Sequence, residues 1–205
     1  MRAKTITIDP DAVDPNGIYT IAAVSALGEL TLAGVLVSGT VATMDYARRI
    51  GIISAGVDTG ITFTIVGTDA DGRAISEAVT GASTATATSI AYFKTITSIT
   101  ASGAAAGNVT IGTVDEFVLN AIPLNHYAKK PATVSIESKT GTIDFTIQET
   151  FSDIWKTPVY IFQDRATDIT IPSYAEVGLH AHGVRLRCNS YTNGAKLKFT
   201  ISSNG

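Results

Sequence analysis

His180 and His182 are the residues whose type and spacing best suit a metal site. They form an H-x-H pair within the run LHAHG. If this run is a strand, both imidazoles project from one face, as two ligands of a zinc ion would. A third ligand would have to come from elsewhere, such as Glu176, Asp168 or His126. Because an H-x-H pair alone is a weak signal, we favour a solvated or buried histidine pair and expect no metal and no other cofactor.

Three aromatic residues, Trp155, Tyr160 and Phe162, lie close together in the sequence and could bind a ligand. Their rings could form a platform on which a sugar stacks. This arrangement would make the protein a carbohydrate- or receptor-binding module, which is the alternative function that we consider. The favoured interpretation is that the same aromatic residues belong to the core of a β-sandwich.

The acidic residues do not indicate a hydrolase. A glycosidase needs two facing carboxylates. Glu149 with Asp153, or Asp164 with Asp168, could supply such a pair, but nothing in the local pattern selects them. The sequence also contains no G-x-S-x-G, P-loop or H-E-x-x-H motif. We therefore expect no catalytic residues and no enzymatic activity.

The run TDADG (68–72) resembles the start of a calcium-binding loop, but it fits a turn better. An EF-hand loop continues with a further acidic residue before its glycine and places a glutamate at the twelfth position. Here Gly72 follows Asp71 directly, and Val79 and Thr80 occupy the place of that glutamate. Two alternating runs flank this Asp-Gly pair, which is a strong signal for a β-hairpin.

These residues would be positioned by strands, because Thr, Ile and Val recur throughout the chain in short alternating runs. Clusters of Gly, Asn, Asp, Ser or Pro interrupt the runs. Asn193-Gly194 lies between two alternating runs and predicts a second hairpin. The best helical candidates are single turns at 45–50 and 151–155.

Short strands separated by turn signals predict an all-β protein of the sandwich or barrel type. We predict two β-sandwich-like modules of the jelly-roll type, with few or no helices. The N-terminal module spans residues 1–118 and includes an N-terminal arm, residues 119–130 form a connector, and the C-terminal module spans 131–205. A single extended sandwich is the alternative.

The charged fraction of the chain is low, at 16%, against about 25% in an average soluble protein. Depletion of charge is a property of interface cores, although a β surface rich in Thr and Ser would also produce it. The net charge is −3, so nucleic-acid binding is not expected. Two basic pairs, Arg185 with Arg187 and Lys196 with Lys198, alternate and should each share one solvated strand face.

Neither disulfide formation nor membrane insertion is expected. Cys188 is the only cysteine, which excludes an internal disulfide, and it fits a small buried hydrophobic residue. Residues 17–37 are apolar over a length that could span a membrane. Glu29 lies near the middle of this segment, and Gly28 and Gly34 divide it into short pieces, so we predict successive buried strands.

Several runs carry a resemblance to structural proteins of tailed bacteriophages. The first is ARRIGIISAGVDTGITFTIVGTDADGRAISEAVTG (47–81), which continues into the run TATSIAYFKTITSITASGAAAGNVTIGT (86–113). The C-terminal part (143–202) is similar in outline, with the runs FTIQETF, VRLRCNS and KLKFTI. The resemblance implies a head decoration, minor head or tail-associated protein, and it offers no catalytic residues.

We therefore expect a non-enzymatic virion structural protein that self-associates and docks on a phage capsid or tail lattice. Its partners would be other virion proteins, such as major capsid or tail proteins. A homo-oligomer is expected, for which a cyclic trimer is one arrangement. Edge strands or the N-terminal TITI run (5–8) would pair with neighbours, and the protein would be assembled into the virion in the host cytoplasm.

Overall fold

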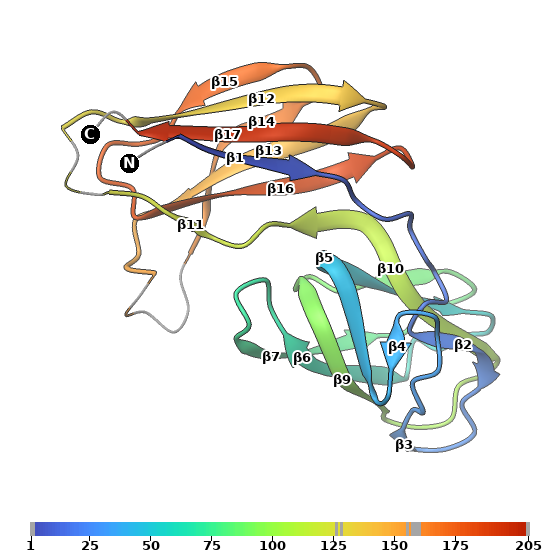
Figure 1. The fold of residues 1–205 in the computed structure, drawn as a ribbon. Coiled ribbons are helices and arrows are strands. Elements are labelled where there is room, and N and C mark those ends of the chain that lie inside the picture. Colours follow the sequence, from blue (N-terminus) through green and yellow to red (C-terminus); the bar gives the residue numbers. More distant parts are fainter. Residues whose placement is uncertain (1–2, 126, 128, 155, 157–160, 204–205) are drawn as a thin grey trace. The chain divides into compact units, whose positions relative to one another are not determined.

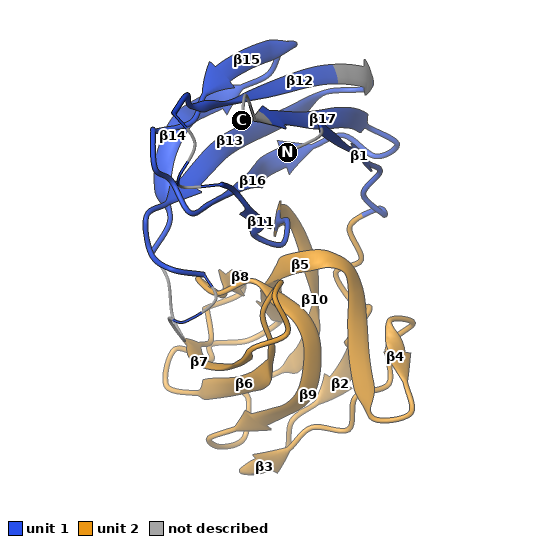
Figure 2. Cartoon of the chain, turned by 60° about the vertical axis from the view of Figure 1, so that its left-hand side comes forward, with its two compact units in different colours: residues 1–12, 118–205 blue, residues 13–117 orange. Residues whose placement is uncertain are grey.

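In a computed structural model the chain forms two compact units built from strands. The structure describes residues 3–125, 127, 129–154, 156 and 161–203. Unit 1 consists of residues 1–12 and 118–205, and unit 2 of residues 13–117 (Figure 2). The described residues contain no helix, which confirms the all-β prediction of the sandwich class.

The units differ from the predicted modules at the N-terminus and in the predicted connector. Residues 1–12 belong to unit 1 because strand β1 (Lys4–Ile8) pairs with β17 (Lys196–Ser203) at the far end of the chain. The region predicted as a connector, 119–130, also pairs within unit 1. Its short strand β11 (Ile122–Pro123) is antiparallel to β16 (Gly183–Tyr191).

Unit 1 contains two sets of paired strands (Figure 1). One is a four-stranded sheet with the order β1-β17-β12-β15, and the other has the order β14-β13-β16, with β11 paired to β16. The remaining strands of this unit are β12 (Ala132–Thr140), β13 (Ile143–Thr150), β14 (Gln163–Ile169) and β15 (Ser173–Glu176).

The core of unit 1 follows the alternation expected of a sandwich, in which every second residue of a strand faces inward. In β17, Leu197 and Phe199 are buried, whereas Lys196 is exposed. In β16, Leu186 and Cys188 are buried, so the only cysteine lies in the core as expected. Both sets of strands thus contribute apolar side chains to the interior of this unit.

The hairpin predicted at Asn193-Gly194 is wrong, although the turn itself is present. Gly194 has a positive φ of 76°, as the turn signal predicted. The turn joins β16 to β17, however, and these strands belong to different sheets. A second turn, at Gly141, joins β12 to β13 in the same way, and the two turns bond to each other where the Thr142 N–H donates to the Thr192 hydroxyl at 3.0 Å.

Unit 2 is built around the strand order β10-β5-β9-β6-β7 (Figure 1). Short strands extend it, with β2 on β10, β3 on β9, and β4 and β8 on β5. The strands are β2 (Tyr19–Ala23), β3 (Gly28–Glu29), β4 (Val37–Ser38), β5 (Val41–Ser54), β6 (Thr62–Thr68), β7 (Ala74–Thr80), β8 (Thr86–Thr88), β9 (Phe93–Ala101) and β10 (Asn108–Val118).

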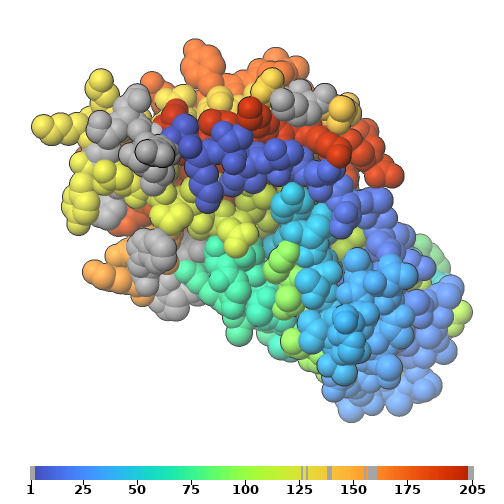
Figure 3. Space-filling view, viewed as in Figure 1, coloured from blue at the N-terminus to red at the C-terminus, as the bar shows by residue number. Residues whose placement is uncertain are grey.

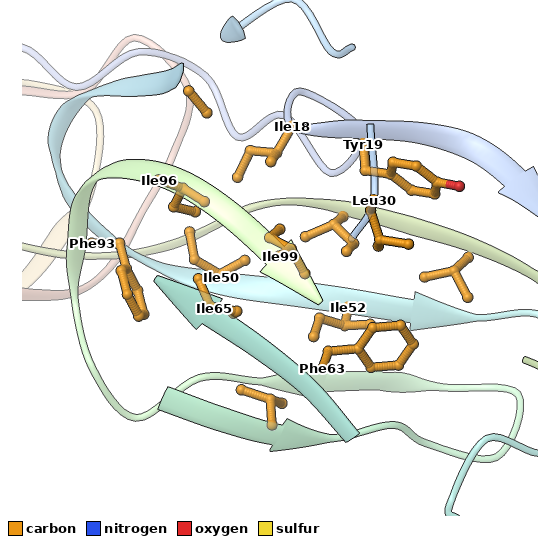
Figure 4. Close-up of a cluster of buried hydrophobic side chains, with 14 of the residues drawn as sticks. Ile18, Tyr19, Leu30, Ile50, Ile52, Phe63, Ile65, Phe93, Ile96 and Ile99 are labelled. Carbon is orange, nitrogen blue, oxygen red and sulfur yellow. The ribbon is translucent and has the colours of Figure 1, made fainter. Parts of the chain in front are cut away.

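One hydrophobic cluster holds these strands together (Figure 4). Phe63 and Ile65 of β6 meet Ile50 and Ile52 of β5 within it, and Ile99 of β9 joins them. All five side chains are fully buried. Burial of a side chain of this size contributes about 1.5–3 kcal/mol of hydrophobic stabilisation, so this cluster stabilises unit 2 strongly.

The helical turn predicted at residues 45–50 is wrong, because this segment is part of the long strand β5. The pairing of β5 with β9 shifts here: Thr43 lies opposite Thr95, and Arg48 lies opposite Phe93. Five positions along β5 therefore correspond to two along β9, which is a large bulge. Regular pairing is therefore interrupted at this segment, but by a bulge in a strand and not by a helical turn.

The apolar segment 17–37 is divided into short strands, as the sequence predicted, but the prediction that these strands are buried is wrong: in β2 only Tyr19 is buried, and Ile21 is 68% exposed. It contains β2 and β3 and ends at the first residue of β4. In the part of the chain that the structure describes, we find no helix with the length and hydrophobicity needed to cross a membrane.

Candidate functional site

A ladder of polar side chains lies on the face of β13 and β16 opposite the core of unit 1. Thr146 and Gln148 of β13 lie directly across from Arg187 and Arg185 of β16. Asn189 extends the row by one further position on the same face of β16. We call these five residues the outer ladder. Arg185 and Arg187 share one strand face here, as their spacing predicted.

Hydrogen bonds connect the outer ladder to Asp164 of β14. The Gln148 amide donates to one carboxylate oxygen of Asp164 at 2.7 Å, and its own oxygen accepts from Arg185 Nε at 2.7 Å. Arg187 Nη2 donates to the other Asp164 oxygen at 3.3 Å, and Arg187 Nε donates to Asn189 at 3.1 Å. The ladder and Asp164 thus form one hydrogen-bonded network, which favours a structural role over a catalytic one.

Arg185 of the outer ladder packs against the ring of Phe162. The guanidinium carbon of Arg185 lies 3.8 Å from the centroid of the Phe162 ring, which is a close cation–π contact. One face of the ring is therefore covered by the chain itself. Trp155 and Tyr160, the other two residues considered for a sugar platform, lie outside the described residues.

Replacing Gln148 with alanine tests the ladder as a structural element. Gln148 is buried, and its loss removes two short hydrogen bonds, one to the Asp164 carboxylate and one from Arg185 Nε. We expect the free energy of unfolding to fall by about 1–3 kcal/mol. Gln163→Ala, at an exposed position, is the control and should change it little. Chemical denaturation followed by circular dichroism measures both, and equal values for the two variants would contradict the assignment.

His180 and His182 do not lie on a strand, so the strand geometry that would place both imidazoles on one face is not formed. Both lie in the segment between β15 and β16, and His180 has a positive φ of 69°. Among the described residues, no group of three or more His, Cys, Asp or Glu side chains is placed to hold a metal ion. His126, one of the possible third ligands, lies outside the described residues.

The carboxylates that could have formed a glycosidase pair have separate roles. Glu149 is buried and accepts the Gly178 N–H at 2.6 Å, so it caps a backbone group. Asp153 lies 3.9 Å from the ammonium of Lys156. Asp164 belongs to the bonding of the outer ladder, and Asp168 adopts a positive φ of 53°.

The TDADG run forms the turn of the hairpin between β6 and β7, as the sequence predicted. The two strands pair in register from Thr62 opposite Thr80 to Thr68 opposite Ala74. The Asp69 carboxylate accepts the N–H groups of Asp71 and Arg73, both at 2.9 Å. Its side chain is therefore used to stabilise the turn.

A buried ion pair in unit 2 was not anticipated from the sequence. The Arg48 side chain is 1% exposed and donates to both carboxylate oxygens of Asp45, at 2.6 and 2.7 Å. Lys94 Nζ donates to the carbonyl oxygens of Met44 and Asp45, at 2.6 and 2.8 Å. These contacts hold the bulge of β5 in place. The sequence does place opposite charges three residues apart, at Asp45 and Arg48, but this spacing is also common on helices and does not indicate burial.

The remaining candidate is the neutral surface that the exposed residues of the segment 15–44 form on unit 2, which we call the neutral face. Glu29 is the only charged residue in this stretch of the sequence. The structure exposes several large apolar side chains here, with Ile21 at 68%, Leu27 at 73% and Val35 at 84% of their accessible area. Figure 3 shows that the atoms of this segment gather on the surface at one end of unit 2.

Two hollows lie on the neutral face beside β3. One has a volume of about 330 Å³ and is lined by residues 29–32, Gly39, Thr40 and Thr97. The other, of about 290 Å³, is lined by Tyr19 and residues 23–31. Both hollows include residues 29–31, so they lie on either side of the same short segment. The neutral face is therefore not flat.

Comparison with known proteins adds no family to these observations. Neither the models of protein families nor the curated proteins give a match to this sequence.

Proposed function

We propose that this chain is a non-enzymatic virion structural protein that self-associates and docks on a phage capsid or tail lattice. The observation that carries the proposal is the neutral face, where Ile21, Leu27 and Val35 are left largely exposed to water. A side chain of this size gains about 1.5–3 kcal/mol when it is fully buried. Covering this surface with another protein is therefore favourable.

The distribution of charge supports the same proposal. Interface cores are depleted of charged residues, and the neutral face has only Glu29. Elsewhere, several charges are neutralised within the chain: Arg48 pairs with Asp45, Arg49 with Glu116 at 2.7 Å, and Arg187 with Asp164 at 3.3 Å. Of the two explanations for the low charged fraction, an apolar interface therefore fits the neutral face better than a surface of hydroxyl groups alone.

The partner in this proposal is another virion protein of the capsid or tail lattice. The resemblance of the runs 47–81 and 86–113 to phage structural proteins supports this choice. On a lattice, many copies of the partner repeat at fixed spacing, so weak contacts add up through multivalency. A modest neutral surface on each copy is then sufficient for stable attachment.

The test places two carboxylates on the neutral face. We expect the double variant Leu27→Glu/Val35→Glu to fold normally, because both side chains are exposed. Its incorporation into particles should fall at least tenfold, since a charge desolvated without a partner costs several kcal/mol. Quantitative mass spectrometry of density-gradient-purified particles, from the phage or prophage that carries this gene, measures the copy number.

The matched control is Ile161→Glu/Ile171→Glu, which adds the same charge at similarly exposed positions outside the neutral face. This variant should be incorporated like the unmodified protein. Immunogold labelling of intact particles should then place the protein at repeated positions on the head or tail. Purified particles that never contain the unmodified protein would refute the virion assignment, and equal incorporation of both variants would refute the role of the neutral face.

A further inference from the structure

Strand β1 is the terminal strand of the four-stranded sheet and is regular along its whole length. It pairs with β17 over all five residues, from Lys4 opposite Ile201 to Ile8 opposite Leu197, without a shift of register. Its second edge pairs with no strand among the described residues. Lys4, Thr5 and Thr7 are exposed and Ile6 is half-buried. Such an edge presents a row of backbone groups that another strand can bond.

The other terminal strands are protected by devices that prevent edge-to-edge pairing. In β15, the carbonyl oxygen of Glu176 already accepts a hydrogen bond from Arg165 at 2.8 Å. The pairing of β14 with β13 shifts register twice, and Asp168 has a positive φ. Beside β7, the Glu77 carboxylate accepts the N–H groups of Ile90 and Ala91, at 2.7 and 2.8 Å.

The short strands of unit 2 are also poor templates. Strand β2 has five residues, like β1, but its pairing with β10 is irregular between Val109 and Ile111. Strands β3 and β4 have two residues each and β8 has three. Strand β1 is thus the regular edge that the described chain leaves without protection.

The sequence of β1 is complementary to itself in an antiparallel arrangement. If two copies pair about Ile6, Lys4 of one copy lies opposite Ile8 of the other, and Thr5 lies opposite Thr7. The two lysines are therefore kept apart, and like charges do not face each other. The two Ile6 side chains meet on the two-fold axis, where each can bury its exposed part against the other.

We propose that two copies of this chain pair through their β1 strands and join their four-stranded sheets into one continuous sheet. This inference rests on the proposed function, because it names the surface through which self-association occurs. The occupant is a second copy, since the register about Ile6 is satisfied by the same five residues on both sides. Such an interface is two-fold symmetric, so it produces a dimer and not a cyclic trimer.

The contact is small, and we expect weak association. Stable interfaces bury about 1,200–2,000 Å² in total, more than a pair of five-residue strands provides. A dissociation constant of about 10 µM is the scale to expect. Sedimentation velocity across a concentration series detects association in this range, and on a lattice the local concentration would exceed it.

A pair of charge variants tests the interface. Both variants contain Thr7→Glu, which lies beside Lys198 of the same chain and should be tolerated. In Thr5→Glu/Thr7→Glu, the two introduced carboxylates oppose each other across the dimer at two places, so the dissociation constant should rise at least tenfold. In Thr5→Lys/Thr7→Glu, opposite charges face each other instead, and the dimer should persist. Circular dichroism and thermal melting confirm that both variants fold.

The outcomes separate this inference from the proposed function. If the unmodified protein stays monomeric at every concentration, self-association itself fails. If it associates but the double-glutamate variant associates equally well, association occurs through another surface and the β1 interface is refuted. Loss of association in both variants would refute the register, because the lysine-containing variant preserves complementarity only when residues 5 and 7 face each other.

Disulfide trapping checks the register independently. In the proposed dimer, the Cα atoms of the two Ile6 residues lie about 4.5–5.5 Å apart, so Ile6→Cys should form a covalent dimer under mild oxidation. In Thr5→Cys, the two cysteines are offset by two residues and lie about 8 Å apart, beyond the range of a disulfide. Cys188 is buried and should not interfere. Equal trapping of the two variants would overturn the register about Ile6.

Discussion

Replacing Arg48 with alanine is expected to lower the free energy of unfolding of unit 2 by about 3–5 kcal/mol. The change leaves the partly buried Asp45 carboxylate without its bidentate partner. It also removes the hydrogen bond from Arg48 Nη1 to the Val114 carbonyl at 3.4 Å and the contact with the Phe117 ring. The bulged segment of β5 then loses the side chain that links Arg48 to Asp45 within it.

Arg49→Ala is the control for this prediction because it removes an adjacent arginine from a more exposed ion pair. The Arg49 and Glu116 side chains are 24% and 29% exposed, so solvent screens their interaction. The variant also removes the hydrogen bond from Arg49 Nε to the Ser89 carbonyl oxygen, so we expect a loss of about 1–2 kcal/mol, still smaller than that of Arg48→Ala. Differential scanning calorimetry measures both variants, and hydrogen exchange of peptides from 41–54 and 93–101 localises the effect. Equal losses for Arg48→Ala and Arg49→Ala would show that the deeper burial of the Arg48–Asp45 pair does not increase its contribution to stability.

Gly67→Ala is expected to destabilise unit 2 by about 3 kcal/mol or more, because the backbone leaves no room for a β-carbon. A Cβ atom at this position would lie 1.9 Å from the Thr95 carbonyl oxygen and 3.0 Å from the Ile96 Cα. Both contacts are with the backbone of β9, so relief requires the strands to separate. The glycine lies where the pairing of β6 with β9 shifts register, which is a bulge position that favours this residue.

The matched substitution is Gly60→Ala, where no heavy atom lies within 4 Å of the added methyl group. We expect its effect on stability to stay within about 0.5 kcal/mol of zero. Thermal unfolding monitored by circular dichroism compares the two variants under the same conditions. A Gly67→Ala protein as stable as the Gly60→Ala protein would contradict the close approach of β6 and β9.

The two proposed surfaces lie on different units and have different roles. The β1 edge of unit 1 would join copies of the chain, and the neutral face of unit 2 would attach it to the lattice. The variants at Thr5 and Thr7 and those at Leu27 and Val35 therefore measure separate steps. A protein that loses one step and retains the other is the expected result of each set.

Several local features could be predicted from the sequence because a short segment determines them. The hairpin at 68–72 follows from the Asp69 side chain, which bonds the backbone within its own turn. The burial of Cys188 follows from the alternation of β16, in which every second residue faces the core. These interactions lie within a few residues of each other in the chain.

The candidate sites could be predicted only in part. The alternation of Arg185 and Arg187 placed them on one face, but their partners Gln148 and Asp164 come from other strands. The burial of Arg48 could not be predicted, because nothing near it in the sequence reveals that β5 bulges and encloses it. Burial depends on which strands pack together, and strand pairing is a long-range choice.

The alternation of apolar residues was enough to predict a protein built from strands, and the Asp-Gly and Asn-Gly pairs located turns at 68–72 and 193–194. Only the folded chain reveals that β1 pairs with β17, that the turn at Asn193-Gly194 connects two sheets, and that Ile21, Leu27 and Val35 stay exposed. This difference arises because backbone preference and alternation act over a few residues. The choice of strand partner, and hence of which face is covered, is set by the total burial of segments far apart in the chain.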